Sequence, residues 1–157
     1  MKKMKRLLTA IMAAALVIAT IPTALAAGGI FSDVPNGAWY ADAVDYVYEH
    51  GIMNGTSATA FSPNSSMTRA MLTAVLYRAS GSPVVTNAVA GFSDVSADAY
   101  YASAVAWANA NGIVTGYGNG RFGSNDPVSR AQIATILWRY AGSPSAEAGA
   151  NFADESS

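Results

Sequence analysis

A long internal duplication constrains the fold of this chain more than any other feature. Residues 31–83 and 92–144 align without a gap at a constant offset, and about 21 of the 53 aligned positions are identical. The identical residues include Phe-Ser-Asp-Val at 31–34 and 92–95 and Gly-Ser-Pro at 81–83 and 142–144. A third copy begins at Asn151-Phe152-Ala153-Asp154. We therefore predict a repeat architecture in which neighbouring units pack on one another.

The residues before the first copy have the pattern of an export signal. Four basic residues at positions 2, 3, 5 and 6 precede an apolar run over 7–21, and Ala24-Leu25-Ala26 then supplies a small-residue cleavage site. The alternative is a membrane anchor, but the run is shorter than the ~20 apolar residues that span a bilayer. We predict a signal peptide over 1–26, repeat 1 over 28–90, repeat 2 over 91–150 and the start of a truncated third repeat over 151–157. No membrane insertion is expected after cleavage.

The charge of the exported product excludes several classes of partner. Removing the four basic residues of the signal from the total of nine leaves five arginines against ten acids, which is a net charge of −5 without lysine. Nucleic acid and anionic membranes require a basic patch. Because the chain has no cysteine, disulfides and thiolate metal sites are excluded. The glycines of 116–120 follow a helix and precede no Walker lysine, so we expect no nucleotide, and neither a metal nor another cofactor.

Each copy is predicted to form a helix, a loop and a second helix, which makes the fold mainly α. In the first helix of repeat 1, Asn36 is the expected N-cap and Gly51 the residue that ends the helix. Thr68 and Ser129 are expected to cap the second helices, Ser129 together with Gln132 as a capping box. Apolar residues at helical spacing predict the buried stripes. They are Tyr40, Ala43, Val44 and Val47; Leu72, Val75, Leu76 and Ala79; Tyr101, Ala104, Val105 and Ala108; Ile133, Ile136, Leu137 and Tyr140.

The motifs of both copies resemble the S-layer homology (SLH) repeat. They are Phe-Ser-Asp-Val, an aromatic pair (Trp39-Tyr40, Tyr100-Tyr101), Gly-Ile-x-x-Gly (51–55, 112–116) and [Thr/Ser]-Arg-Ala (68–70, 129–131). The resemblance implies tandem helix-loop-helix repeats around a pseudo-symmetric axis, usually three, that anchor bacterial envelope proteins non-covalently. It implies binding of secondary cell-wall polysaccharide, often with a pyruvylated sugar, in grooves between repeats.

The resemblance also assigns site residues. In the family, the arginine of a Thr-Arg-Ala-Glu motif contacts the anionic sugar. That role carries over to Arg69 and Arg130, and weaker carry-overs fall on Asp33, Asp94, Gly55 and Gly116. The motif glutamate is replaced by Met71 in one copy and by Gln132 in the other.

Each candidate has an alternative structural interpretation. Arg69 and Arg130 stand at the start of a helix, where a cation opposes the dipole, and could instead form a salt bridge to Asp33 or Asp94. The two aspartates could equally cap a local turn. Arg78 and Arg139 complement the dipole at a helix end, which predicts a structural role. The aromatic pairs could stack on a sugar or, as is commoner, belong to the core.

The predicted function is non-catalytic anchoring at the cell surface through an anionic cell-wall polysaccharide. A cysteine nucleophile is impossible, His50 is the single histidine, and no Gly-x-Ser-x-Gly motif is present, so we do not expect an enzyme. The alternative function is a self-assembly module of the cell envelope, in which other SLH chains complete the array of repeats.

Overall fold

A computed structural model describes residues 29–86 and 91–145. It contains four helices, α1 (Ala41–Glu49), α2 (Arg69–Ala79), α3 (Ala102–Ala110) and α4 (Arg130–Tyr140), and no β-strand in the described part. Each repeat therefore has the predicted order of helix, loop and helix. The predicted signal peptide (1–26) and the start of a third repeat (151–157) lie outside the described residues.

The helix ends follow local sequence signals at all but one of the predicted caps. Thr68 accepts a hydrogen bond from the Met71 N–H, and Ser129 and Gln132 form the complete capping box. Gly51 follows the C-cap of α1 in the left-handed region (φ 64°).

The prediction of an N-cap at Asn36 was wrong. Helix α1 begins at Ala41, and its N-cap residue Tyr40 makes no side-chain cap bond. Consecutive turns lead into the helix instead: the Ala38 N–H donates to the Pro35 carbonyl (3.0 Å) and the Ala41 N–H to the Ala38 carbonyl (2.9 Å). The chain thus supplies a backbone acceptor near the helix start, where a side-chain cap would otherwise be needed.

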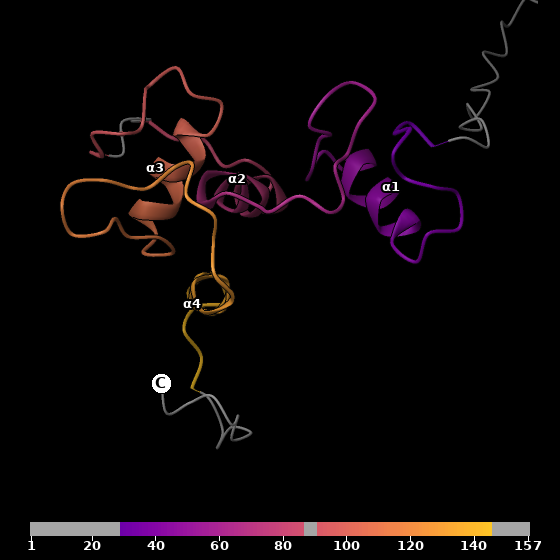
Figure 1. Ribbon diagram of the computed structural model, residues 1–157. Helices are drawn as coiled ribbons and strands as arrows, with labels where there is room; N and C mark the ends of the chain where they lie inside the picture. Colours follow the sequence, from indigo (N-terminus) through magenta and orange to yellow (C-terminus); the bar gives the residue numbers. More distant parts are fainter. Residues whose placement is uncertain (1–28, 87–90, 146–157) are drawn as a thin grey trace, which may run out of the picture.

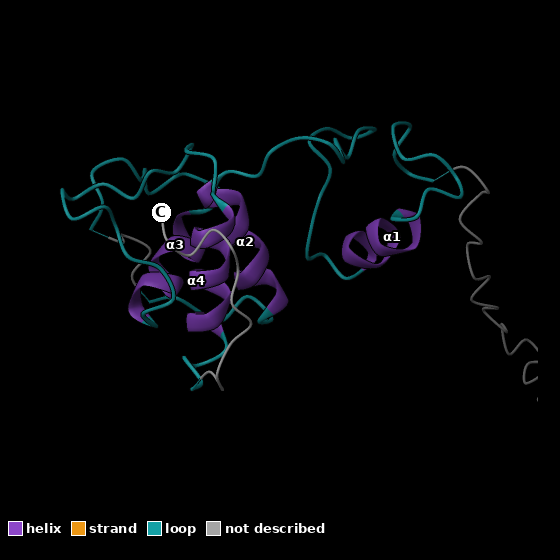
Figure 2. Ribbon diagram, turned by 60° about the horizontal axis from the view of Figure 1, so that its bottom comes forward, coloured by secondary structure: helices purple, strands orange, loops and turns teal. Residues whose placement is uncertain are grey.

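Helices α2 and α3 pack against each other, and α4, which lies beside them in Figure 2, contributes Ile136 to the same larger core. Its buried members come from both repeats: Ala70, Leu72, Leu76, Val105, Ala108, Ile113, Val114, Phe122 and Ile136. The Trp107 ring lies near the rings of Tyr77 and Tyr140, at centroid distances of 5.6 and 6.4 Å. The predicted packing of one repeat on the next is therefore confirmed, since α2 of repeat 1 packs on α3 of repeat 2.

Helix α1 stands to one side of this bundle in both views (Figures 1 and 2). Its own small core consists of Phe31, Val34 and Val44, with Tyr48 and Phe61 packed against it. The Phe31 ring meets the Tyr48 ring edge to face at 5.1 Å. The first half of repeat 1 is thus held by its own loops, whereas the first half of repeat 2 is covered by α2.

The predicted stripe of α4 is buried only in part. Ile136 is 2% exposed, but Leu137 and Tyr140 are 44% and 39% exposed. On α1, Ala43 is exposed although it belongs to the predicted stripe. Within the described ranges, no helix has the length and apolar character needed to cross a membrane.

Candidate functional site

Arg69, the first residue of α2, reaches across from repeat 1 into the loop of repeat 2. Its Nη2 donates to the Thr115 carbonyl oxygen at 2.7 Å. Its guanidinium carbon lies 5.3 Å from the centroid of the Tyr117 ring and 5.1 Å from that of the Phe122 ring. The side chain is thereby placed between two aromatic rings, a favourable environment for a guanidinium group.

The backbone at the start of α2 holds this arrangement in place. The Arg69 N–H donates to the Asp126 carbonyl (2.9 Å) and the Ala70 N–H to the Ser124 carbonyl (3.1 Å). These are two of the N–H groups that have no acceptor within a helix. The loop of repeat 2 therefore satisfies the first turn of α2 and fixes the position of Arg69.

The charge of Arg69 has no anionic partner in the described part of the chain. Arg69 is 6% exposed, and its Nε has no hydrogen-bond partner there. The salt bridge found among the described residues joins Arg121 Nε and Asp94 Oδ2 at 3.9 Å, on the surface. The alternative of a salt bridge from Arg69 to Asp33 or Asp94 is thus not what the structure contains. The Thr115 carbonyl and the two rings compensate this buried charge in part, and an anionic ligand would compensate it further.

Arg69 lines a cavity of about 280 Å³ that residues of both repeats form. The loop of repeat 2 contributes Thr115, Gly116 and Tyr117, and one side of α4 contributes Ala131, Gln132, Thr135, Ile136 and Arg139. The structure thus brings together two residues predicted for the site, Arg69 and Gly116. It adds a second arginine, Arg139, on the same cavity.

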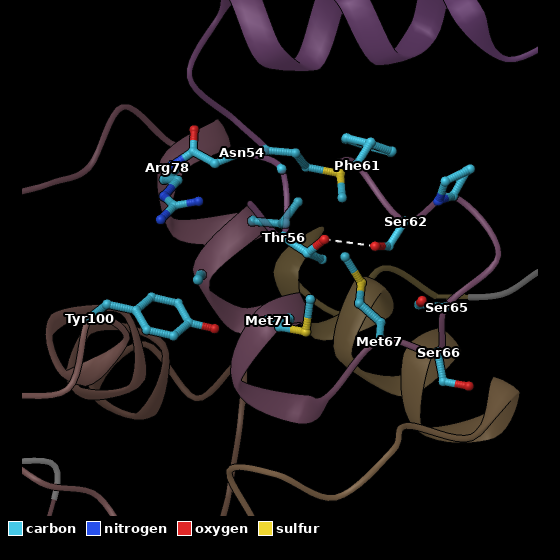
Figure 3. A pocket seen from close by; sticks show the side chains of 15 residues that line it. Asn54, Thr56, Phe61, Ser62, Ser65, Ser66, Met67, Met71, Arg78 and Tyr100 are labelled. Atoms are coloured by element: carbon cyan, nitrogen blue, oxygen red, sulfur yellow. Dashed lines mark hydrogen bonds between the residues drawn. The ribbon is translucent and has the colours of Figure 1, made fainter. Parts of the chain in front are cut away.

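A larger cavity of about 680 Å³ occupies the equivalent place in repeat 1. Subtracting the repeat offset of 61 from seven residues of the smaller cavity gives residues of the larger one: Asn54, Gly55, Thr56, Met71, Ala74, Val75 and Arg78. Tyr100 of repeat 2 borders it from the other side, and its hydroxyl points toward Met71 (Figure 3). No arginine of a preceding repeat lines this cavity, which distinguishes it from the smaller one.

Asp33 and Asp94 clamp the loop that precedes the second helix of each repeat. The Phe61 and Ser62 N–H groups donate to the two carboxylate oxygens of Asp33 at 2.8 and 2.7 Å. These bonds lower the pKa of Asp33 below its ordinary value.

In repeat 2, the Phe122 and Gly123 N–H groups donate to Asp94 at 2.7 and 2.8 Å. Burial alone would raise the pKa of Asp94, but these bonds and the nearby Arg121 together lower it. Neither carboxylate lines a cavity, so both shape the loops next to the site.

Gly55 and Gly116 hold the same loops close to the first aromatic residue of each repeat. A Cβ atom at Gly116 would lie 2.6 Å from the Arg121 carbonyl oxygen and 2.6 Å from Cε1 of Phe92. At Gly55 it would overlap the Phe31 ring and lie 2.5 Å from the Ala60 carbonyl oxygen. Both positions therefore require glycine for close packing, in addition to lining the cavities.

Arg130, Trp39 and Tyr100 lie on the surface, whereas Tyr40 and Tyr101 of the aromatic pairs pack against the two cores. Arg130 stands at the start of α4 like Arg69 at the start of α2, but it is exposed and belongs to neither cavity. Trp39 and Tyr100 are 94% and 66% exposed, each meeting its neighbouring tyrosine edge to face. Tyr100 and its hydroxyl are thus available to a ligand in the larger cavity, as the stacking interpretation requires.

Comparison with known families agrees with the motifs and the repeat geometry. The model of the S-layer homology domain matches residues 30–70 and 91–134, one match in each repeat. This chain belongs to the S-layer homology family. The prediction of an SLH protein is therefore confirmed, and with it the localisation at the cell surface.

Three relatives are similar to this chain over two thirds of its length or more. The chain is 30% identical over 133 residues to the S-layer protein sap of Bacillus anthracis, which is 85% of this chain and 16% of that protein. It is 38% identical over 109 residues to an endoglucanase of a Bacillus species, 69% of this chain and 11% of that protein. An amylopullulanase of Thermoanaerobacterium thermosulfurigenes is 35% identical over 117 residues, 70% of this chain and 6% of that protein.

The chain thus spans less than a fifth of the length of these relatives. A stretch shared by S-layer proteins and by enzymes of different names is typical of an attachment module rather than of a catalytic domain. The described residues also contain no cluster of acids and histidines that could hold a metal ion. The SLH repeats form a cell-surface module.

Two features of the site were not predicted from the sequence. Arg139 and Arg78 were interpreted as structural, yet both line cavities. Tyr117 lies in a glycine-rich loop and differs from Thr56 at the equivalent position of repeat 1, so the duplication did not mark it. Arg78 and Arg139 occupy equivalent positions of the two repeats, and this repetition was the available signal.

Proposed function

We propose that this SLH module anchors a cell-surface protein by binding an anionic secondary cell-wall polysaccharide. The observation that carries the proposal is the uncompensated Arg69, buried to 6% exposure and lining a cavity between two repeats. A carboxylate that entered this cavity would supply the missing negative charge and accept hydrogen bonds from the guanidinium group.

The composition of the cavity favours a sugar acid over a bare inorganic anion. Tyr117 offers an aromatic ring, and Gln132 and Thr135 offer an amide and a hydroxyl for sugar hydroxyl groups. Arg139 of α4 adds a second cation to the lining of the cavity. A pyruvylated sugar combines a carboxylate with a carbohydrate ring and therefore matches this set of groups. The similarity to the S-layer protein named above supports a ligand at the cell surface.

The test is co-sedimentation of residues 27–157 with purified cell-wall sacculi, before and after removal of their secondary polymer. We expect binding that disappears when the polymer is stripped and falls strongly when only its pyruvate groups are removed. The variant Arg69→Met should lose most of the binding, since it keeps an apolar side chain between the two rings but has no charge. Its fold should persist, because an unpaired buried charge is removed.

The matched control is Arg121→Met, which removes an exposed arginine of the same loop that lines neither cavity. It should bind sacculi like the unmodified chain. Circular dichroism and thermal unfolding of both variants separate a loss of binding from a loss of fold. Equal binding by Arg69→Met and the unmodified chain, or binding that persists on stripped sacculi, would refute the proposed site.

A further inference from the structure

Helix α4 exposes the same face that α2 uses inside the chain. Leu76 of α2 is 7% exposed, whereas its equivalent Leu137 is 44% exposed. Arg69 is 6% exposed and bound to the next loop, whereas its equivalent Arg130 is exposed. Within the described part of the chain, the first two N–H groups of α4 donate to no backbone carbonyl, although those of α2 do. We call this uncovered side of α4 the donor face.

Helix α1 and the loop that follows it expose the complementary surface. In repeat 2, α2 covers Ala104 and Ile113, which are 2% and 5% exposed. Their equivalents in repeat 1, Ala43 and Ile52, are exposed and half-buried. We call this side of α1, together with Ile52, Asn54, Pro63 and Ser65, the acceptor face.

The groups that receive α2 in repeat 2 are main-chain carbonyls, so repeat 1 can offer the same contacts. They belong to Thr115, Ser124 and Asp126, and the equivalent residues of the acceptor face are Asn54, Pro63 and Ser65. A carbonyl is present at each position whatever the side chain. The difference in residue type between the two loops therefore leaves this set of acceptors intact.

The helices that bear the two faces also carry opposite charges. Helix α1 contains three acids, Asp42, Asp45 and Glu49, and no basic residue, whereas α4 contains Arg130 and Arg139 and no acid. Within one chain, α2 packs on α3, and this contact has no such attraction between the helices because α3 has no charged residue. Opposite charge attracts α4 toward α1 and adds a salt-dependent term to their association.

We propose that the donor face of one chain docks on the acceptor face of a second copy. Arg130 of the first chain would reach the Asn54 carbonyl of the second, as Arg69 reaches the Thr115 carbonyl within one chain. The first chain then supplies the larger cavity of the second with a counterpart of Arg69, in addition to the Arg78 that already lines it. The contact joins two different surfaces, so it is head-to-tail and can continue from chain to chain. It does not depend on the polysaccharide.

Sedimentation velocity of residues 27–157 without polymer provides the first measurement. The average mass should rise above that of one chain with concentration, and it should fall again at high salt. Substitution of Leu137→Glu blocks the donor face, and Ala43→Glu blocks the acceptor face. Both positions are exposed in the single chain, so both variants should keep the circular dichroism spectrum of the unmodified protein.

A mixture of the two variants gives the decisive result. Each variant alone should remain monomeric, because every copy lacks the same face. When the two variants are mixed, the intact donor face of Ala43→Glu can dock on the intact acceptor face of Leu137→Glu. The mixture should therefore form a one-to-one dimer that grows no further. The control Ala58→Glu adds the same charge at an exposed alanine whose equivalent, Asn119, is also exposed. It should associate like the unmodified chain.

The inference is overturned if the unmodified chain stays monomeric over the whole dilution series. It is also overturned if Leu137→Glu or Ala43→Glu associates as strongly as the control, or if the mixture contains monomers alone. Arg130→Met tests the arginine itself: we expect the dissociation constant to rise at least about tenfold, as for loss of a central charged contact.

Discussion

Arg69 shows how a single residue can be favourable for binding and unfavourable for the unliganded fold. Its guanidinium group lies between two rings and donates to one carbonyl, but no anion is within ion-pair distance in the described part of the chain. The desolvated charge is thus left for a ligand to compensate. An anion that binds here stabilises the folded chain by mass action, so ligand binding and thermal stability are linked.

The close contacts of Gly116 lead to a prediction for stability. We expect Gly116→Ala to lower the free energy of unfolding by about 1–3 kcal/mol, because the new Cβ would overlap a main-chain carbonyl that cannot rotate away. Urea denaturation followed by circular dichroism measures this change. Gly29→Ala is the control, since a Cβ there meets nothing within 4 Å. Equal stability of the two variants would contradict the packing role of Gly116.

The aspartate clamps predict a loss of stability in acid. The folded-state pKa values of Asp33 and Asp94 lie below the ordinary value of 3.8, so the clamps stabilise the fold fully above that pH. Their contribution is lost as the pH falls through the lowered pKa values, because the protonated carboxyl group accepts the two N–H bonds less well.

Urea denaturation at a series of pH values from neutral to strongly acidic tests the clamps. The free energy of unfolding should fall below about pH 4 in the unmodified chain. In the double variant Asp33→Asn with Asp94→Asn, it should be lower at neutral pH and should depend less on pH. An identical acid dependence in both proteins would show that other groups are responsible.

At the scale of elements, the two equivalent helices α1 and α3 have very different surroundings. Helix α3 has five buried residues and lies against α2, whereas α1 has one, Val44. Local opening follows the amount of buried apolar contact. We therefore predict that α1 opens locally more easily than α3, although the two helices are equivalent in sequence position.

Hydrogen exchange at low protein concentration measures this difference. We expect the amides of α1 to exchange faster than those of α3 and to approach the rates of the loops. The comparison is internal, because both helices have nine residues and occupy equivalent positions of their repeats. Equal protection of the two helices would mean that the small core around Phe31 is sufficient by itself.

At the scale of the whole molecule, the sequence predicted local features better than contacts between repeats. The helices, the Ser129 capping box and the glycines at helix ends depend on neighbouring residues, and these predictions were correct. The cap at Asn36 was predicted wrongly because a run of turns replaced it. The cavities could not be located from the sequence, because each is lined by residues that lie far apart in the chain. The alignment of the two repeats does not show which of these residues meet in space.

The arginines illustrate the same limit. The duplication marked Arg69 and Arg130 as equivalent, yet one is buried and the other exposed, because only α2 is followed by a complete repeat within the described chain. Arg139 was assigned to the helix dipole from its position in α4, which is compatible with its place on the cavity. Chemical equivalence in sequence does not imply equivalent surroundings.

The junction between repeats recognises main-chain atoms. The acceptors of Arg69 and of the first turn of α2 are the carbonyls of Thr115, Asp126 and Ser124, and none of these contacts depends on a side chain of the loop. A duplicated copy of the gene segment can therefore change loop residues other than Gly116 and Phe122 without losing these carbonyl acceptors. Recombination between copies would still yield chains whose units join. Because these acceptors are main-chain atoms, side chains that line the cavity of one repeat can change in evolution while the repeats remain joined.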